Sequence, residues 1–142
     1  MEITRRFEID AGHRVYGHDG KCASLHGHRY VVEVHVEAPV LDHLGRVVDF
    51  GVIKEMFGRW LDRHWDHAML LWKEDPVAWL YDENGPLYGQ QVCILPFNPT
   101  AENMADYLLN RIAPHLLVEP LVCTQVVVRE TPNCWAKATL DD

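Results

Sequence analysis

The chain has 142 residues, 48% of them hydrophobic and 24% charged, which is enough for one domain with a sizeable core but not for two. Its 13 basic and 21 acidic residues give a formal net charge of −8, which argues against a surface that neutralises nucleic acid or an anionic membrane. No apolar run reaches the roughly 20 residues of a membrane helix, and the first residues lack the apolar core of a secretory signal. We therefore expect a cytoplasmic protein with neither nucleic acid nor membrane as a partner.

Two strands are predicted near the start of the chain, because apolar and polar residues alternate over residues 2–13 and 28–38. His13 is the last residue on the apolar face of the first strand. His26 and His28 extend the apolar face of the second strand towards its beginning. Three histidines are therefore expected on faces that otherwise point into the core.

Two helices are predicted further along. Apolar residues recur at intervals of three and four over residues 50–64, after Asp49 as N-cap. The same spacing follows Thr100, the N-cap of a second helix that begins at residue 101. Pro114 should kink or end this second helix, because proline lacks an amide hydrogen.

The segment at about 68–97 is rich in Pro, Gly, Asp and Trp and shows no sustained period beyond a short strand at 91–95, so we expect a long loop insertion. Residues rich in β-branched side chains then predict strands at 121–129 and 135–140. This order predicts an α+β fold, with a four-stranded antiparallel sheet and two helices inserted between strands two and three. The whole chain, residues 1–142, is expected to form a single domain.

The histidine content indicates a metal site. The chain has 9 histidines, while its 4 cysteines are irregularly spaced and form no Cys-x-x-Cys pair, which argues against a disulfide framework or a thiolate zinc site. In His26-Gly27-His28 the two imidazoles lie on one side of a strand, about 6.6 Å apart along it. An antiparallel neighbour would bring His13 beside them, and three histidines with an open fourth position describe a catalytic zinc site.

The alternative for these histidines is ordinary packing, with Gly27 easing a bulge. The shared parity favours a metal, since a buried imidazole is costly unless something satisfies it. Other candidates also have two interpretations. Cys22 is either a thiol made easier to ionise by a nearby cation or a small buried apolar residue. Asp66-His67 is either an acid–base pair or a histidine at a helix end, and Glu130 is either an acceptor for ligand N–H groups or an exposed charge.

Several motifs in order resemble the 6-pyruvoyl-tetrahydropterin synthase and 6-carboxy-tetrahydropterin synthase family from the first predicted strand to the last. They are Phe7-x-x-x-Ala11-x-His13, Cys22-x-x-x-His26-Gly27-His28, Asp66-His67, Pro99-Thr100-x-Glu102-Asn103 and Glu130-Thr131. The resemblance implies the tunnelling fold (T-fold), in which ββααββ protomers assemble into a ring, commonly a hexamer made of two trimers. It also implies active sites that lie between subunits of this homo-oligomer.

Residue by residue, the resemblance implies three groups of site residues. They are the zinc ligands His13, His26 and His28, the catalytic residues Cys22, Asp66 and His67, and the substrate-binding residues Glu130, Thr100 and Glu102. Glu130 matches the carboxylate that anchors the pterin ring and Cys22 matches the catalytic base. Helix capping explains Thr100 equally well.

The implied activity is that of a zinc-dependent lyase acting on 7,8-dihydroneopterin triphosphate. The Cys-x-x-x-His-Gly-His spacing resembles the carboxy-type enzymes, which form 6-carboxy-5,6,7,8-tetrahydropterin with loss of triphosphate and acetaldehyde on the path to queuosine. The alternatives are a 6-pyruvoyl-tetrahydropterin synthase, a plain zinc hydrolase that needs no Cys22, and a non-catalytic pterin-binding protein. The segment at 68–97 is longer than in compact bacterial members, and it could be a lid, a subunit contact or a determinant of side-chain chemistry.

Overall fold

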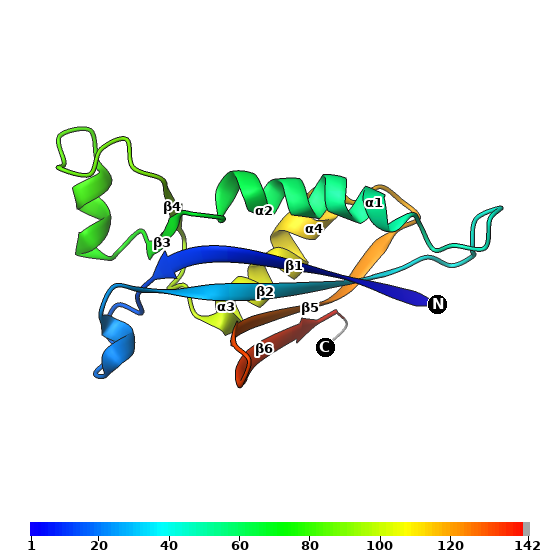
Figure 1. Ribbon diagram of the computed structural model, residues 1–142, viewed down its shortest axis with the longest axis horizontal. Helices are drawn as coiled ribbons and strands as arrows, with labels where there is room; N and C mark the ends of the chain where they lie inside the picture. The colour runs from blue at the N-terminus through cyan, green and yellow to red at the C-terminus, as the bar shows by residue number, and fades with distance from the viewer. Residues whose placement is uncertain (141–142) are drawn as a thin grey trace.

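In a computed structural model, which describes residues 1–140, two long helices pack on one face of a six-stranded sheet (Figure 1). The strand order across the sheet is β4-β3-β1-β2-β5-β6. The strands are β1 Glu2–His13, β2 His26–Glu37, β3 Met69–Trp72, β4 Val92–Leu95, β5 Val122–Thr131 and β6 Cys134–Thr139. The predicted α+β class is thus confirmed, with a sheet larger than expected.

The prediction of four strands was wrong, because the 68–97 segment adds β3 and β4 to the sheet. Leu70 of β3 pairs with His13 of β1 in a parallel ladder, and β3 in turn pairs with β4 in parallel. Within this segment, β4 matches the short strand expected at 91–95, whereas β3 was not expected. Strands of four residues are too short to show a period, and Leu70, Leu71 and Leu95 are buried by contacts with distant parts of the chain.

The β1–β2 register places the three histidines together. These strands are antiparallel, with His13 opposite His26 and Ala11 opposite His28. Because side chains alternate across a strand, all three imidazoles project from one face at the end of this pair. The other long pairs, β2–β5 and β5–β6, are also antiparallel, as predicted.

The first helix runs from Phe50 to His64, as predicted. Two α-helical parts, α1 (Phe50–Ile53) and α2 (Arg59–His64), flank a π-helical turn at Lys54–Gly58. Its N-cap is Asp49, whose Oδ1 accepts the Gly51 N–H at 2.7 Å.

The second helix has the same construction. It consists of α3 (Ala101–Tyr107), a π-helical turn at Leu108–Ile112 and α4 (Ala113–Leu116). Thr100 caps it by accepting the Asn103 N–H at 3.1 Å. The π-helical turn ends two residues before Pro114, and the helix ends two residues after that proline, which cannot donate to the helical ladder.

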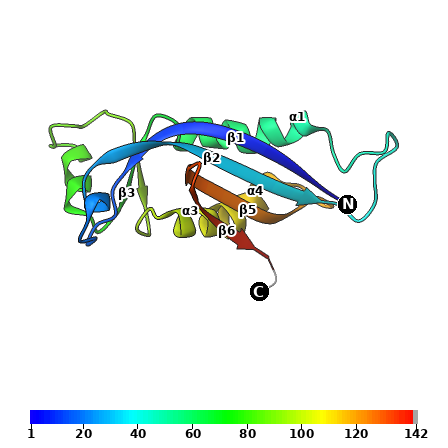
Figure 2. The same ribbon diagram turned by 60° about the horizontal axis from the view of Figure 1, so that its bottom comes forward.

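The core lies between the helices and the sheet. The two views in Figures 1 and 2 show both helices on the same side of the sheet. Burying each large apolar side chain there stabilises the fold by about 1.5–3 kcal/mol. The fully buried residues include Ile9, Tyr30, Val32, Val34, Ile53, Phe57, Leu61, Trp65, Met104 and Leu108.

The opposite face of β1 and β2 carries ion pairs instead. Arg29 Nη1 lies 2.9 Å from Asp10 Oδ2, and Arg129 Nε lies 2.9 Å from Glu33 Oε2. The sheet is therefore apolar on the helix side and charged on the other. Two cavities, of about 500 and about 1030 Å³, lie on different sides of it near the three histidines.

An ion pair anchors the chain beyond β3. Arg14, directly after His13, donates from Nε to Asp75 Oδ2 at 2.7 Å and from Nη2 to Asp75 Oδ1. Asp75 is fully buried and also caps the short 3₁₀ helix Pro76–Tyr81 by accepting the Val77 N–H. This contact joins the 68–97 segment to the end of β1.

Across residues 1–140, every helix is too short or too polar to cross a membrane.

Candidate metal centre

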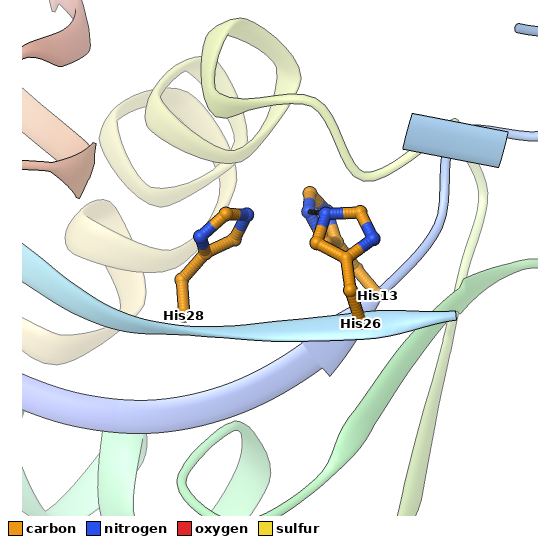
Figure 3. Close-up of side chains that lie close together, drawn as sticks. All are labelled: His13, His26 and His28. Carbon is orange, nitrogen blue, oxygen red and sulfur yellow. Dashed lines mark hydrogen bonds between the residues drawn. The ribbon is translucent and has the colours of Figure 1, made fainter. Parts of the chain in front are cut away.

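Three imidazoles converge at the end of the β1–β2 pair, on the side of the sheet that carries the helices. Figure 3 shows His26 and His28 rising from β2, with the His13 ring beside them from β1. One nitrogen of each ring lies within 4.8 Å of the other two. The sequence prediction that these residues meet is confirmed by this geometry.

Backbone carbonyls orient two of the rings. His13 Nδ1 lies 2.7 Å from the Pro99 carbonyl oxygen, and His26 Nδ1 lies 2.6 Å from the Ser24 carbonyl oxygen. A carbonyl only accepts, so each neutral ring carries its hydrogen on Nδ1 and leaves Nε2 with a free lone pair. These two Nε2 atoms are 3.0 Å apart. Lone pairs so placed repel each other unless a cation lies close to both.

The third ring offers an unsatisfied nitrogen. His28 Nε2 is buried and has no hydrogen-bond partner among residues 1–140. Leaving such a group unpaired costs about 1–3 kcal/mol. A metal ion would satisfy it together with the two other lone pairs. The donor set fits zinc, which takes three neutral histidines at catalytic sites and keeps a fourth position open.

The surroundings favour the neutral form of two of these rings, His13 and His28. Burial lowers the pKa of His13 to about 4, against the Pro99 hydrogen bond and helped by the neighbouring His26 and His28. Burial is also the main reason that the pKa of His28 is lowered, although the Glu130 carboxylate acts in the opposite direction. Metals bind the unprotonated ring, so this environment favours a ligand role near neutral pH.

Glu130 lies beside the histidines, at the end of β5. Its Oε1 is 3.9 Å from His13 Nε2, and its side chain is 25% exposed. Glu130 also borders a cavity of about 500 Å³ with Thr100 and Glu102 from the start of the second helix. The structure therefore brings all three predicted substrate-binding residues to one cavity next to the histidines.

Cys22 is half-buried, in a turn at Lys21–Ala23, and its thiol is free. The Cys22 carbonyl accepts the Val15 N–H at 2.8 Å, which ties this turn to the chain just after His13. The atoms that lie within 4.8 Å of one another come from the three histidines and do not include the Cys22 thiol. The turn is thus near the metal centre, without supplying a ligand to it.

Asp66 and His67 lie elsewhere. Asp66 Oδ1 accepts the Asp10 N–H at 2.9 Å, and Asp66 Oδ2 is 3.0 Å from His67 Nδ1. His67 lines a cavity of about 1030 Å³ with Gly12 and Arg29, and His26 and His28 also border this cavity. Gly12 and Arg29 alternate with the site histidines along β1 and β2, so the pair lies towards the face of the sheet opposite to the one from which the imidazoles project. Within one copy, neither Asp66 nor His67 joins the cluster of imidazole nitrogens.

The His67 backbone is strained. Its φ of 60° lies in the left-handed region, which is uncommon for residues other than glycine. A hydrogen bond from the His67 N–H to the Asp10 carbonyl at 2.6 Å holds this conformation. The side chain is 72% exposed, so the strain serves to display it on the surface.

Sequence reasoning missed Tyr30, which is fully buried behind the site. Its ring packs edge-on against His13 and His28, with centroid distances of 5.7 and 5.4 Å. Its hydroxyl has no hydrogen-bond partner in the described chain, and burial raises its pKa. The parity that joins His26, His28 and Tyr30 was the available signal.

Comparisons with known proteins agree with this architecture. Residues 2–140 match the family model described as 6-pyruvoyl tetrahydropterin synthase. The chain is 43% identical over 138 residues to 6-carboxy-5,6,7,8-tetrahydropterin synthase from Rickettsia felis, covering 96% of this chain and 99% of that protein. The protein of the same name from Rickettsia bellii is 44% identical with the same coverage.

Solved structures share the fold. An uncharacterised protein from Wolinella succinogenes has a TM-score of 0.85 at 24% identity, covering 99% of this chain and 98% of that one. The 6-pyruvoyl tetrahydropterin synthase from Caenorhabditis elegans has a TM-score of 0.71 at 22% identity, covering 99% and 96%. These likenesses confirm the expected T-fold. With the family model matching nearly every residue, the chain belongs to the 6-pyruvoyl tetrahydropterin synthase family.

Proposed function

We propose that the chain is a zinc-dependent 6-carboxy-tetrahydropterin synthase. It would be a lyase that converts 7,8-dihydroneopterin triphosphate to 6-carboxy-5,6,7,8-tetrahydropterin with loss of triphosphate and acetaldehyde, on the path to queuosine. The observation that carries the proposal is the convergence of a buried histidine, His13, with the half-buried His26 and His28, whose oriented and unsatisfied nitrogens fit a metal ion. The choice of reaction is supported by relatives that bear this enzyme name and match over nearly their full length.

His13, His26 and His28 would hold the zinc ion through one nitrogen each. Bound zinc supplies a Lewis acid with an open position for oxygens of the substrate side chain. The chain itself favours the unprotonated form of His13 and His28 by burial and fixes the ring orientations of His13 and His26 through backbone carbonyls. Such hydrogen bonds to the second ring nitrogen orient a ligand and raise its basicity.

Glu130 would anchor the pterin ring. A carboxylate can accept two parallel N–H bonds, and its partial exposure towards the 500 Å³ cavity leaves those positions reachable. Thr100 and Glu102 line the same cavity and are assigned to substrate binding. The Thr100 oxygen already accepts a helix N–H, while its hydroxyl hydrogen remains able to donate to a ligand.

Cys22 would remove a carbon-bound proton, and Asp66 and His67 would supply or take protons as triphosphate leaves. The Asp66 carboxylate, 3.0 Å from His67 Nδ1, would hold that ring in one orientation. Since this pair lies on the opposite face of its own sheet, the relay at each site would come from a neighbouring copy. We therefore propose a homo-oligomer with active sites between subunits, a hexamer made of two trimers.

The 68–97 segment bears on the choice of product. We propose that residues 1–142 act as a single domain in which this segment is an insertion joined to the sheet through β3 and β4. It places Tyr81 and Leu87 in the same cavity as His67. It would thus form a wall near the proton relay and could select between 6-carboxy and 6-pyruvoyl products.

The test is a product assay. Purified protein, loaded with Zn²⁺ and kept reduced, is incubated with 7,8-dihydroneopterin triphosphate, and pterin products and acetaldehyde are identified by mass. We expect 6-carboxy-5,6,7,8-tetrahydropterin and acetaldehyde. A 6-pyruvoyl product without acetaldehyde would reassign the reaction, and pterin binding without turnover would indicate a binding protein.

Matched variants connect the activity to the site. His26→Ala should lose zinc and turnover by more than about 100-fold, because disturbing only the partners of a ligand costs 10–100-fold. His43→Ala, an exposed histidine in the loop before the first helix, should keep both. Zinc content is measured by elemental analysis. Full zinc content in His26→Ala would remove it from the ligand set, and turnover retained in Cys22→Ala would favour a plain zinc hydrolase.

A further inference from the structure

Asn98, in the loop between β4 and the second helix, takes part in four hydrogen bonds through its side chain and its backbone carbonyl. Its Oδ1 accepts the Tyr16 N–H at 3.0 Å, and its Nδ2 donates to the Tyr16 carbonyl at 2.8 Å. Its own carbonyl accepts the Thr100 N–H at 2.8 Å and a hydrogen from Asn103 Nδ2 at 3.0 Å. One side chain thus joins the chain after His13 to the loop that leads into the helix.

The residue that follows Asn98 orients a histidine of the metal centre. The buried Pro99 presents its carbonyl to His13 Nδ1 at 2.7 Å. Proline has no amide hydrogen, so Pro99 cannot be fixed by a backbone donor of its own. The position of its carbonyl therefore depends on the bonds made by its neighbours Asn98 and Thr100.

The other end of the Asn98 contact is also fixed. Tyr16 lies three residues after His13, and between them Arg14 forms its ion pair with the fully buried Asp75. The Asn98 side chain is consequently held against a stretch of backbone that cannot move freely. The His13 ring and the Pro99 carbonyl are therefore both positioned by a closed series of contacts that runs through His13, Tyr16, Asn98 and Pro99.

We propose that Asn98 is a positioning residue for the metal centre. It holds the Pro99 carbonyl against His13 Nδ1, which keeps the hydrogen of that ring on Nδ1 and leaves Nε2 free and aimed at the other two histidines. Its importance for zinc rests on the proposed function. Its effect on the His13 ring does not, because that effect exists in the metal-free protein.

Two substitutions separate the contacts. Asn98→Ala removes both bonds to Tyr16. Asn98→Asp keeps the shape and the acceptor for the Tyr16 N–H, but it places a carboxylate oxygen against the Tyr16 carbonyl. The matched control is Asn110→Ala, since Asn110 Nδ2 donates to Asp106 Oδ1 at 2.8 Å, on the exposed side of the second helix.

Each full-length protein is measured in two ways. Nitrogen-15 NMR of labelled imidazoles reports which nitrogen of His13 carries the hydrogen in the metal-free state. Competition with a chromophoric chelator gives the affinity for Zn²⁺ alone. A residue that merely stabilises the loop would lower the melting temperature and leave the hydrogen on Nδ1.

For wild type and Asn110→Ala we expect the Nδ1–H form and the same zinc affinity. For Asn98→Ala we expect a mixture of the two ring forms and a loss of about 10–100-fold in zinc affinity, the range for disturbing the hydrogen-bond partner of a metal ligand, here the Pro99 carbonyl. Asn98→Asp should lie between them. If Asn98→Ala does not fold, Asn98→Asp decides by the same two readouts.

Unchanged ring form and affinity in the Asn98 variants would overturn the proposal, even if their melting temperatures fall. Failure of wild type to bind zinc would defeat the proposed function instead. In that case the imidazole spectra of metal-free wild type and variants still decide whether Asn98 positions His13.

Discussion

The histidine triad and the Asp66–His67 pair differ in how much of their environment one chain supplies. His13 is 1% exposed and its ring is oriented by a carbonyl from a distant loop. His67 is 72% exposed, and within the described chain its side chain forms an ion pair with the residue before it, Asp66. The first group is assembled by the core of one copy, while the second is displayed on a surface by a strained backbone.

This difference suits the two groups to different parts of the proposed reaction. Metal ligands need fixed distances, which a closely packed interior provides. A proton relay needs access to substrate, and an exposed side chain at a cavity provides it. If the two groups act on the same substrate, the contact between copies must bring them together, so the oligomer becomes part of the proposed active site.

The largest expected effect tests this division directly. Cys22→Ala and His67→Ala should each retain zinc and each lower turnover by about 10²–10⁴-fold, the usual contribution of a general acid or base. Co-expressed, the two variants should regain activity, because about a quarter of the sites in a random mixed oligomer combine an intact Cys22 with a neighbour's intact His67.

The matched control for this mixture is co-expression of Cys22→Ala with a variant that carries both substitutions. No site in those oligomers can contain both groups, so turnover should stay low. The mixtures are compared by product formation per mole of zinc. Equal activity in the two mixtures would show that Cys22 and His67 do not meet across subunits.

A smaller effect concerns His13, the buried member of the histidine triad. His13 has a pKa of about 4 when folded and about 6.5 when unfolded, so the unfolded chain binds an extra proton between these values. The free energy of unfolding of the metal-free protein should therefore fall as the pH drops from 6.5 to 4, by about 3 kcal/mol from His13, and this loss is complete below pH 4. Urea unfolding in the presence of a chelator measures it. His13→Gln should lack this part of the pH dependence, and identical pH profiles for the two proteins would contradict it.

The smallest effect separates the two assignments of Thr100. Thr100→Ala removes the cap of the second helix and should lower the free energy of unfolding by about 1 kcal/mol, whereas Thr100→Asn restores a capping side chain and should recover most of it. Urea unfolding gives the stabilities and fluorescence titration gives pterin affinity. Weaker pterin binding in both variants would establish a ligand contact; weaker binding in neither would leave capping as the role of Thr100.

The long-range geometry of the metal centre could be predicted because it follows from local patterns. Alternation fixed the faces of β1 and β2, and an antiparallel pairing of those faces sufficed to bring His13 beside His26. The Asp49 and Thr100 caps were predictable for the same reason, since a capping side chain and the backbone N–H that donates to it lie within three residues.

The rest depends on contacts that no local pattern encodes. The strand β3 pairs in parallel with the edge of β1 that β2 leaves free, and β4 pairs in parallel with β3. Both strands have four residues, which is too short to show a period. The carbonyls of Ser24 and Pro99 orient the rings of His26 and His13, yet every residue has a carbonyl and the sequence does not mark which ones form such bonds. The face on which His67 lies follows from the chain path after the first helix, which the Asp66-His67 motif does not specify.

The π-helical turn inside each helix limits how the chain can change in length. Ile53, Phe57, Leu61 and Trp65 recur every four residues, a spacing that drifts by about 40° per repeat in a regular α-helix with 100° per residue. The wider turn at Lys54–Gly58 absorbs this drift, so all four side chains are buried. Deleting a single residue from the turn would restore regular winding, because the seven residue steps left between Ile53 and Leu61 turn by about 700°, which is within about 20° of two full turns, so Leu61 and Trp65 would still face the sheet. The helix should therefore tolerate a single deletion in this turn much better than a single insertion, which would add a further rotation of about 100°.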